Sequence, residues 1–572
     1  MEGRVRIVFI FLALAFISII VRLFYWQVIK AKELSEAAKK QYQIGKKITA
    51  PRGNILSSDR SWLAGRVNGF LTYAYLPDIE KTPKDIAEML APVFLDEDND
   101  RPELLAEIGR VESMLNKKDV VWVPLKNKVD NDSKKTIESF SLSGIGFELE
   151  ELRAYPEAST AAHMLGFLGK NEAGGDQGYF GLEGFYDLVL AGKPGFLTRE
   201  SDAKGIPIVL GDNQEISAVE GVNLLTYIDK SIQLSVEDNL KKGLERYGAI
   251  AGTVIVMNPS TGAVVAMASF PSYDPEKYVL YSNELFKNPA ISDGFEPGSV
   301  FKVLVMASAL DADVIEPDTI CDICNGPYRV DKYSIETWNN QYYPGSTMTD
   351  VIVHSDNVGM VFVANKLGKE KMYDYLHKFG LGQLTAIDLQ GEMTPTLREK
   401  NTWNIVDLAT SSFGQGIAVT PIQLITAVSA IANDGKLMTP QIVDKLEGES
   451  WEEDIKPKEI TRVISEEAAR NITSMMVEAA KNGESKWTHQ TGFKVAGKTG
   501  TAQIPLSGHY DEDKTIASFI GFAPFDNPKF VMLVTLREPQ SSQWASETAA
   551  PLWYDIARDL FMYYGIQPDR ED

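Results

Sequence analysis

Cysteine and histidine are scarce in this chain, whose 572 residues include two cysteines, Cys321 and Cys324, and five histidines. A Cys-x-x-Cys pair can supply half of a zinc site or be redox-active. Zinc would need two more ligands, and no histidine neighbours these cysteines in the sequence, so we expect no metal. A small-loop disulfide and two free thiols remain equally open, and neither makes this pair the active centre.

Positive charge is also in short supply, with 57 Lys and Arg against 79 Asp and Glu and a formal net charge of -22. Such a field repels nucleic acid, so we expect no nucleic-acid partner. The sequence contains neither a phosphate-binding glycine loop nor an internal repeat. A chain of this length, with 44% apolar residues, predicts several domains with substantial cores.

The N-terminus has one long apolar run, which begins at Ile7 and extends past Arg22 to Ile29. That is about the roughly 20 residues that span a bilayer. A cleaved signal peptide is the alternative, but the small-x-small site within reach, residues 13–15, lies in the middle of the run. We therefore predict one membrane anchor. Its orientation is less secure, because Arg4 and Arg6 precede the run whereas four lysines, at positions 30, 32, 39 and 40, follow it, so that a count of flanking cations favours the opposite orientation.

The first chemical motif is Ser299-Val300-Phe301-Lys302, which follows Pro297 and Gly298 and opens an almost wholly apolar run to Leu310. This pattern predicts a largely buried helix with Ser299 at its positive end. Positions i and i+3 share a helix face, so the Lys302 amine can reach the Ser299 hydroxyl. Burial would lower the pKa of Lys302, and a neutral amine can take the serine proton. We interpret Ser299 as a nucleophile and Lys302 as its base, although the tetrapeptide alone is weak evidence.

The second motif, Ser355-Asp356-Asn357, lies between two helical stretches. From a loop, Ser355 could relay a proton and Asn357 could hydrogen-bond a substrate amide. The alternative is an ordinary turn or helix N-cap, in which these residue types are common. Taken alone, the cap is the better interpretation.

The third motif, Lys498-Thr499-Gly500-Thr501, lies in a strand-like run over residues 493–504. Lys498 with the hydroxyls of Thr499 and Thr501 suits a carboxylate, and Gly500 lets another backbone approach closely. An extended peptide could add to this strand edge, and the backbone N–H groups of Ser299 and Thr501 are candidates for an oxyanion hole. A strand ending in a turn is the alternative for this motif alone.

Together, in this order, the three motifs resemble those of the class B penicillin-binding proteins. Residues 258–262 resemble the first hairpin of that family's catalytic domain, and residues 51–56, 153–156 and 181–184 resemble its N-terminal pedestal. Residues 413–416 and 433–435 also resemble segments of the family. One departure follows residue 56, where Asp59 and Arg60 match a family turn but its glycine is missing.

The resemblance implies a peptidoglycan D,D-transpeptidase that needs no cofactor and is acylated by β-lactams. Ser299 would attack the penultimate D-alanine of a stem peptide, with Lys302 as base. Ser355 and Lys498 would pass a proton to the leaving amine. Asn357 would orient the donor amide, while Thr499, Gly500 and Thr501 would bind its end.

The resemblance also bears on cellular role. The Asn357-Val358-Gly359 continuation resembles septal, division-type members, which implies other division proteins as partners. Because the pedestal-like segments leave no room for a glycosyltransferase domain upstream, a separate membrane glycosyltransferase is also implied. It also implies a single-pass membrane protein with its catalytic domain outside the cytoplasm. A D,D-carboxypeptidase or β-lactamase-like hydrolase, and a membrane-anchored division scaffold or β-lactam sensor, are the alternatives.

The predicted organisation is a cytoplasmic tip and anchor over residues 1–30, a stalk and mixed pedestal over 31–220, and a transpeptidase domain over 221–572. The last should begin with a helix at 231–247, continue with a hairpin of strands 253–257 and 263–269, and end with strands 517–523 and 530–536 and a helix at 544–564. Strands at both ends with helices between them predict an α+β fold, an antiparallel sheet flanked by helices.

Overall fold

A computed structural model describes residues 2–95, 101–118, 120–200, 213–488, 492–506 and 509–568. The chain forms two compact units. The first comprises residues 1–52 and 191–221, and the second comprises residues 53–190 and 222–572.

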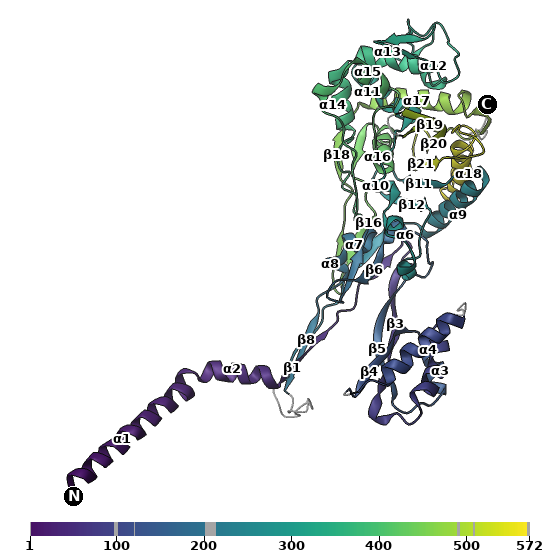
Figure 1. The fold of residues 1–572 in the computed structure, drawn as a ribbon. Coiled ribbons are helices and arrows are strands. Elements are labelled where there is room, and N and C mark those ends of the chain that lie inside the picture. Colours follow the sequence, from purple (N-terminus) through teal and green to yellow (C-terminus); the bar gives the residue numbers. More distant parts are fainter. Residues whose placement is uncertain are drawn as a thin grey trace. The chain divides into compact units, whose positions relative to one another are not determined.

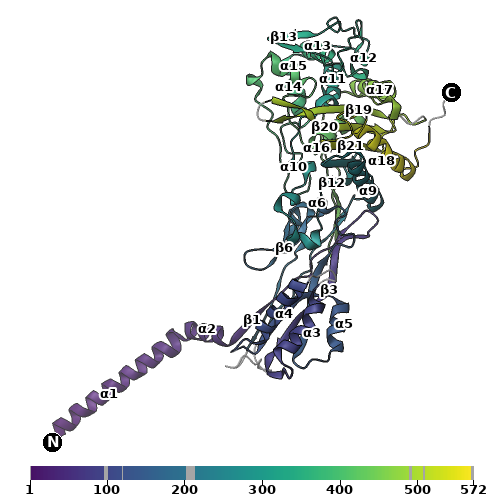
Figure 2. The ribbon, with the colours of Figure 1, turned by 45° about the vertical axis from the view of Figure 1, so that its right-hand side comes forward.

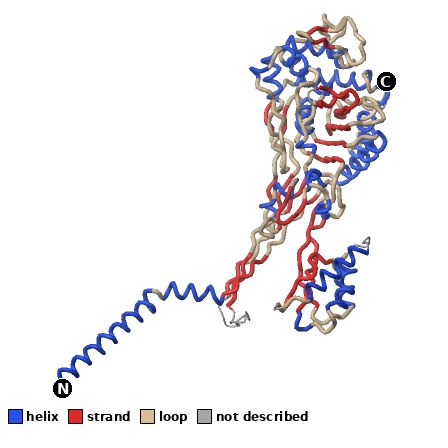
Figure 3. Tube along the Cα trace, in the orientation of Figure 1, coloured by secondary structure: helices blue, strands red, loops and turns tan. Residues whose placement is uncertain are grey.

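The first unit contains the apolar N-terminal helix and a small sheet. Helix α1 (Glu2–Phe24) continues through a π-helical turn (Tyr25–Ile29), and helix α2 (Ala31–Tyr42) follows after a break that Figure 3 shows. The segment Glu2–Ile29 is long and apolar enough to cross a membrane. Strands β1 (Gln43–Ile48), β8 (Gly195–Glu200) and β9 (Asn213–Ile216) pair antiparallel in the order β1-β8-β9.

The second unit begins with a sheet that three helices cover on one face. Strand β3 (Trp62–Tyr75) pairs antiparallel with both β4 (Trp122–Val129) and β5 (Ile145–Ala154). Leu90, Val111 and Val123 belong to the core between this sheet and its helices. The helices are α3 (Pro83–Phe94), α4 (Arg101–Leu115) and α5 (Asn131–Ser139).

Three of the family-like segments meet at one buried ion pair. Arg153 Nε lies 2.6 Å from Glu183 Oε1, and the two side chains are 4% and 0% exposed. Arg153 Nη1 donates to the Gly53 carbonyl oxygen at 2.7 Å, and Tyr155 Oη donates to Glu183 Oε1 at 3.4 Å. The ion pair and its hydrogen bonds therefore join distant parts of the chain. They also satisfy the Glu183 carboxylate, since a buried carboxylate is tolerated only when it is paired.

The turn that lacks the family glycine closes by other means. Arg60 itself takes the left-handed conformation, with φ 68°, and its N–H donates to the Ser57 carbonyl oxygen at 2.9 Å. Asp59 Oδ1 accepts from the Ser61 N–H at 2.9 Å. The side-chain hydrogen bond from Ser57 lowers the pKa of Asp59 to about 2, so this carboxylate is ionised and holds the turn at neutral pH.

The C-terminal part of the second unit is built on a five-stranded antiparallel sheet with the order β12-β11-β21-β20-β19. Val254 and Val256 on β11 pack into one core and Ile255 into another, as the two-residue period of a strand requires when both faces are covered. The strands are β11 (Ala251–Met257), β12 (Val264–Phe270), β19 (Ala496–Leu506), β20 (His509–Ala523) and β21 (Phe530–Arg537).

Helices cover both faces of this sheet (Figures 1 and 2), which confirms the predicted α+β class. Helices α9 (Lys230–Tyr247) and α18 (Ala549–Tyr563) lie against one face. On the other lie α11 (Lys302–Asp311), α16 (Pro421–Ala432) and α17 (Glu466–Asn482).

Other elements complete the second unit, and four of the strands given next extend the β3 sheet, whose order is β17-β16-β10-β2-β3-β4. These other elements are α6 (Ala162–Leu165), α7 (Gly181–Phe185), α8 (Asp187–Leu190), α10 (Pro289–Ser292), α12 (Met348–Val353), α13 (Asn357–Leu367), α14 (Lys369–Lys378), α15 (Ile405–Ser411), β2 (Ile55–Leu56), β6 (Phe167–Lys170), β7 (Asp176–Tyr179), β10 (Asn223–Thr226), β13 (Tyr328–Val330), β14 (Tyr333–Ile335), β15 (Lys436–Met438), β16 (Val443–Glu447), β17 (Glu452–Asp454) and β18 (Glu459–Arg462).

The closing helix begins later than the sequence pattern predicts. The expected start was residue 544, whereas α18 starts at Ala549. Pro551 then falls in the first turn, where its missing N–H leaves no helical hydrogen bond unmade. Trp544 and Ala545 instead form a turn whose Ala545 N–H donates to Thr501 Oγ1 at 3.0 Å.

Candidate active site

Ser299 lies in a 3₁₀ turn (Gly298–Phe301) that leads directly into α11. The regular α-helix thus begins at Lys302 and not at Ser299, although the two residues keep the expected i, i+3 spacing. Gly298 permits this entry because its φ is +57°, a conformation that side chains disfavour. Lys302 and the eight residues after it are buried.

Strand β19 packs directly on this turn. A Cβ atom added to Gly500 would lie 2.9 Å from the Val300 nitrogen and 3.0 Å from the Pro297 oxygen, and one added to Gly298 would lie 3.0 Å from the Thr501 oxygen. The predicted close approach at Gly500 therefore exists, and the approaching backbone is the turn that carries Ser299. The first and third motifs are in contact as a result.

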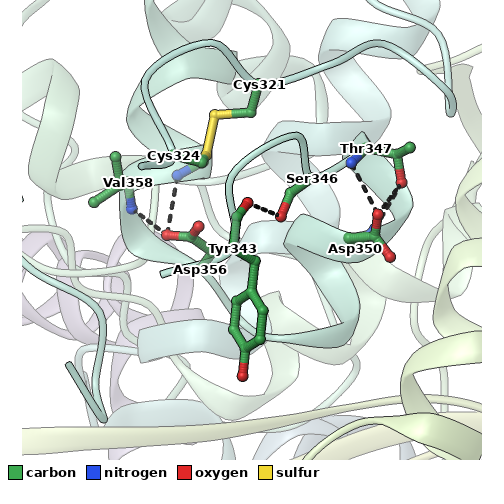
Figure 4. The surroundings of a disulfide bond; sticks show 9 residues. Cys321, Cys324, Tyr343, Ser346, Thr347, Asp350, Asp356 and Val358 are labelled. Carbon is green, nitrogen blue, oxygen red and sulfur yellow. Dashed lines mark hydrogen bonds between the residues drawn. A yellow bond between two sulfur atoms is a disulfide. The ribbon is translucent and has the colours of Figure 1, made fainter. Parts of the chain in front are cut away.

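The second motif is both a helix cap and a neighbour of Lys302. Asp356 caps α13, because its Oδ1 accepts from the N–H groups of Val358 at 2.8 Å and Gly359 at 3.2 Å (Figure 4). Ser355, with φ 55°, and Asn357 flank this cap and contact the lysine amine. The cap interpretation is therefore confirmed for Asp356, while Ser355 and Asn357 lie beside the Lys302 amine.

The Lys302 amine is fully buried and has three acceptors. It donates to the Ser355 carbonyl oxygen at 2.5 Å, to Asn357 Oδ1 at 2.8 Å and to Ser355 Oγ at 3.2 Å. No hydrogen bond within the described ranges joins it to Ser299 Oγ. Burial, and next the positive charge of Lys498, lower the pKa of Lys302 to about 7, so a large fraction is neutral at physiological pH.

The third motif presents two threonines with different partners. Thr501 Oγ1 accepts from Ala545 N–H, which leaves its own proton available. Thr499 Oγ1 accepts from Lys498 Nζ at 3.1 Å and donates to Glu484 Oε2 at 2.6 Å. Thr501 is therefore better placed than Thr499 to donate a hydrogen bond to a carboxylate.

Sequence reasoning missed Glu484. It follows α17 by two residues, in a segment with no recognisable motif. Gly483 is the one visible signal: a Cβ atom there would lie 2.3 Å from the Ala479 oxygen and 2.9 Å from the Val353 oxygen. This glycine lets the chain pass close to the end of α12 and so reach Thr499.

Aromatic rings link the surroundings of the second and third motifs. Asn357 Nδ2 donates to the Glu336 oxygen at 2.9 Å, and two residues further on Trp338 contacts Trp544 with ring centroids 5.1 Å apart. Trp544 precedes Ala545, the partner of Thr501. The His354 ring stacks on the Tyr343 ring with centroids 3.9 Å apart.

Cys321 and Cys324 form a disulfide, which decides between the two alternatives left by the sequence. Both cysteines are buried, and the Cys321 N–H donates to the Ser346 oxygen at 2.9 Å. Figure 4 shows the residues around this bond, which include Asp356 and Val358 at the start of α13. The disulfide thus fixes a loop that lies near the second motif and is separate from the proposed chemistry.

Comparison with known proteins identifies the family. Residues 252–558 match the penicillin binding protein transpeptidase domain, and residues 47–226 match the penicillin-binding protein dimerisation domain. The chain belongs to the class B penicillin-binding proteins. In this penicillin-binding protein all three motifs fall within the part that matches the transpeptidase domain.

Similar proteins cover nearly the whole of this penicillin-binding protein. It is 30% identical to stage V sporulation protein D of Bacillus subtilis, over 99% of this chain and 86% of that protein. It is 30% identical to peptidoglycan D,D-transpeptidase FtsI of Escherichia coli K12, over 78% of this chain and 73% of that protein. Penicillin binding protein 3 from Mycobacterium tuberculosis, solved in complex with aztreonam, superimposes with a TM-score of 0.70 and 25% identity, covering 91% of this chain and 98% of that one.

Proposed function

We propose that this penicillin-binding protein is a serine peptidoglycan D,D-transpeptidase of the division septum, with Ser299 as its nucleophile. The observation that carries the proposal is the meeting of three distant motifs around one buried amine. Lys302 bonds to Ser355 and Asn357, while the Ser299 turn packs on the strand that holds Lys498. An alcohol, a base of lowered pKa and a carboxylate-binding strand are the parts that serine acyl transfer requires.

In the acylation step, Ser299 Oγ forms a bond to the penultimate D-alanine carbonyl carbon as its proton passes to the neutral Lys302 amine. The bond to the terminal D-alanine nitrogen then breaks, and that nitrogen takes up a proton passed on through Ser355 with help from Lys498. Backbone N–H groups of Ser299 and Thr501 would hold the oxyanion. An amine of a second stem peptide attacks the acyl-enzyme in the reverse sense, forming the cross-link and freeing Ser299.

Substrate binding uses the remaining motif residues. Asn357 Nδ2 and Oδ1 already have protein partners, so an incoming donor amide shares or replaces one of them. Thr501 donates its free hydroxyl proton to the donor carboxylate, near the positive charge of Lys498. The open edge of β19, an outer strand of its sheet, accommodates the extended peptide, and Thr499 and Gly500 line that strand.

The cellular setting follows from the substrate. The segment Glu2–Ile29 anchors the protein in the membrane. Because cross-linked cell wall lies outside the cytoplasm, the residues that follow this segment lie on the outer side. We place a separate glycosyltransferase, which makes the glycan strands, and other division proteins among its partners.

A fluorescent penicillin tests the assignment. Wild type labels covalently and Ser299→Ala stays dark. Ser308→Ala, which removes a buried hydroxyl from α11, the helix that follows Ser299, labels like wild type. Equal labelling of wild type and Ser299→Ala would refute Ser299 as the nucleophile. Release of D-alanine from a stem peptide that depends on an added acceptor amine distinguishes a transpeptidase from a carboxypeptidase, which releases it without one.

A role in spore formation is the second candidate, because the relative matched over 99% of this chain is named stage V sporulation protein D. Complementation separates the two. Restored division in a filamenting strain depleted of its septal transpeptidase supports the septal role. Restored sporulation in a strain that lacks the sporulation relative, without rescue of filamentation, supports the role in spore formation.

A further inference from the structure

Two lysine side chains are buried together in the proposed active site. Lys302 is 0% exposed and Lys498 is 3% exposed. Neither forms an ion pair with a carboxylate within the described part of the chain. Two ammonium ions at such a site repel each other and lack water, so one of them must lose its proton at neutral pH.

The hydrogen-bond partners of the two amines differ in a way that decides which proton is lost. All three acceptors of Lys302 are neutral oxygens, from Ser355 and Asn357. Lys498 donates to the Thr499 carbonyl oxygen at 3.3 Å and also to Thr499 Oγ1 at 3.1 Å, and the Thr499 hydroxyl donates its own proton to the Glu484 carboxylate at 2.6 Å. A single hydroxyl thus connects Lys498 to an anion, and a hydrogen bond to a carboxylate is among the stronger ones.

We infer that Glu484 is a positioning residue for acyl transfer: acting through Thr499, it keeps Lys498 protonated and thereby leaves Lys302 as the neutral base. This inference rests on the proposed function. Burial lowers the pKa of both lysines, and the Glu484 charge raises both. Its hydroxyl relay, however, leads to Lys498 alone.

The other charged group near Lys302 does not take this role. Asp356 also raises the pKa of Lys302, but less than Glu484 does. Its Oδ1 accepts from two N–H groups at the start of α13, and its Oδ2 has no hydrogen-bond partner among the described residues. The Asp356 charge is thus directed at the helix N-terminus, which leaves Glu484 as the anion linked to the lysine pair.

The position of Glu484 is fixed by the end of α17. The Gly483 N–H donates to the Ala479 oxygen at 2.9 Å, and any side chain at position 483 would collide with backbone from α17 and α12. Glu484 therefore approaches the Lys498 strand from the same segment that packs beside the second motif. Glu484 contacts Thr499, a proposed peptide-binding residue, and does not contact the reacting atoms themselves.

Glu484→Gln removes the negative charge and keeps an oxygen that can accept from Thr499. Loss of that charge favours the neutral form of each lysine, so the macroscopic pKa values of the pair both fall. At low pH the acylation rate falls because Lys302 becomes protonated. At high pH it falls because Lys498 loses its proton. Both limbs of the rate profile should therefore move to lower pH by about one unit. The maximum should fall about tenfold, because the remaining proton is then shared between the two amines.

The experiment measures the second-order rate constant of acylation by a fluorescent penicillin from pH 5 to pH 10 on the full-length protein. Glu484→Asp, which keeps the charge, should retain the limb positions of wild type with a lower maximum. Glu478→Gln is the matched control, because it removes an exposed carboxylate from α17, the helix that precedes Glu484. It should leave the whole profile unchanged.

The outcomes separate this inference from the function on which it rests. Limbs that stay in place in Glu484→Gln, with or without a lower maximum, overturn the inference, because a merely structural residue changes the amount of competent enzyme and not its pH profile. Equal labelling of wild type and Ser299→Ala overturns the proposed function, and this inference falls with it. A shift of both limbs to lower pH in Glu484→Gln alone supports it.

Discussion

Replacing Lys302 by methionine should abolish acylation and at the same time stabilise the fold at neutral pH. Methionine has a similar length and no charge, so it can fill the buried space among the apolar residues of α11. Acylation should fall at least about a thousandfold, because the general base is lost. Burial of the Lys302 amine destabilises the folded protein, so its removal should increase the free energy of unfolding while it abolishes acylation.

The size of the gain follows from the lowered pKa. The shift from 10.5 to about 7 corresponds to about 5 kcal/mol against the charged amine in the folded state. Three acceptors lose their donor in the variant, at about 1 kcal/mol each. Lys302→Met should therefore be more stable than wild type by about 2 kcal/mol at pH 7.

The difference should reverse as the pH rises. Below pH 7 the amine is protonated in the folded and unfolded states, and the full cost applies. Between pH 7 and 10.5 the folded protein has released the proton that the unfolded chain still binds, so the unfolding free energy of wild type increases with pH through this window. Lys302→Met lacks this pH dependence of the unfolding free energy. By pH 10 wild type should therefore be the more stable protein by about 2 kcal/mol.

Urea unfolding followed by tryptophan fluorescence at pH 7, 8.5 and 10 measures this difference. Ser299→Ala is the control, because it also prevents acylation but carries no titrating group and should follow wild type at each pH. The reasoning is refuted if Lys302→Met is less stable than wild type by the same amount at pH 7 and at pH 10. That result would mean that the lysine is buried without a change in its pKa.

Two further substitutions test the packing around the site and the joint far from it. Gly500→Ala places a methyl group 2.9 Å from the Val300 nitrogen and 3.0 Å from the Pro297 oxygen, so the Ser299 turn must shift. Penicillin acylation should drop at least about tenfold. Gly326→Ala is the control, because a Cβ atom added there meets no atom within 4 Å. Arg153→Ala removes a 2.6 Å ion pair to the fully buried Glu183 and should lower the free energy of unfolding by about 3–5 kcal/mol. The folded fraction of that variant should still acylate at the wild-type rate, since the pair lies outside the three motifs; a selective loss of acylation would contradict a purely structural role.

The sheet and its covering helices could be predicted because their residues have clear periods and clear ends. The hairpin of β11 and β12 and the pair β20 and β21 follow from apolar runs separated by turn residues. The start of α18 could not be predicted as well, because the apolar pattern begins at Trp544 whereas backbone partners decide the helix start. Ala545 donates its N–H to Thr501, a residue 44 positions away, and no local pattern reports such a partner.

The candidate site divides in the same way. Ser299, Lys302 and the Lys498 strand are visible because their spacing carries chemistry by itself. Glu484 is not visible, since a lone glutamate after a helix is an ordinary surface residue until Thr499 is found 2.6 Å from it. The disulfide was equally undecided, because spacing allows the bond but only the fold brings the two sulfur atoms together.

The dual nature of Ser355-Asp356-Asn357 has a physical reason. Asp356 satisfies two N–H groups at the start of α13, and this cap fixes the backbone on both sides of it. The fixed backbone aims the Ser355 carbonyl oxygen and Asn357 Oδ1 at one point, where the Lys302 amine sits. The Asp356 cap and the two neighbours of Lys302 thus belong to one short segment, in which the cap supplies the rigidity that the proposed base needs. Asp356→Asn, which can still cap, should therefore preserve acylation far better than Asp356→Ala, and equal loss in both would show that the charge of Asp356, and not its cap, matters to the site.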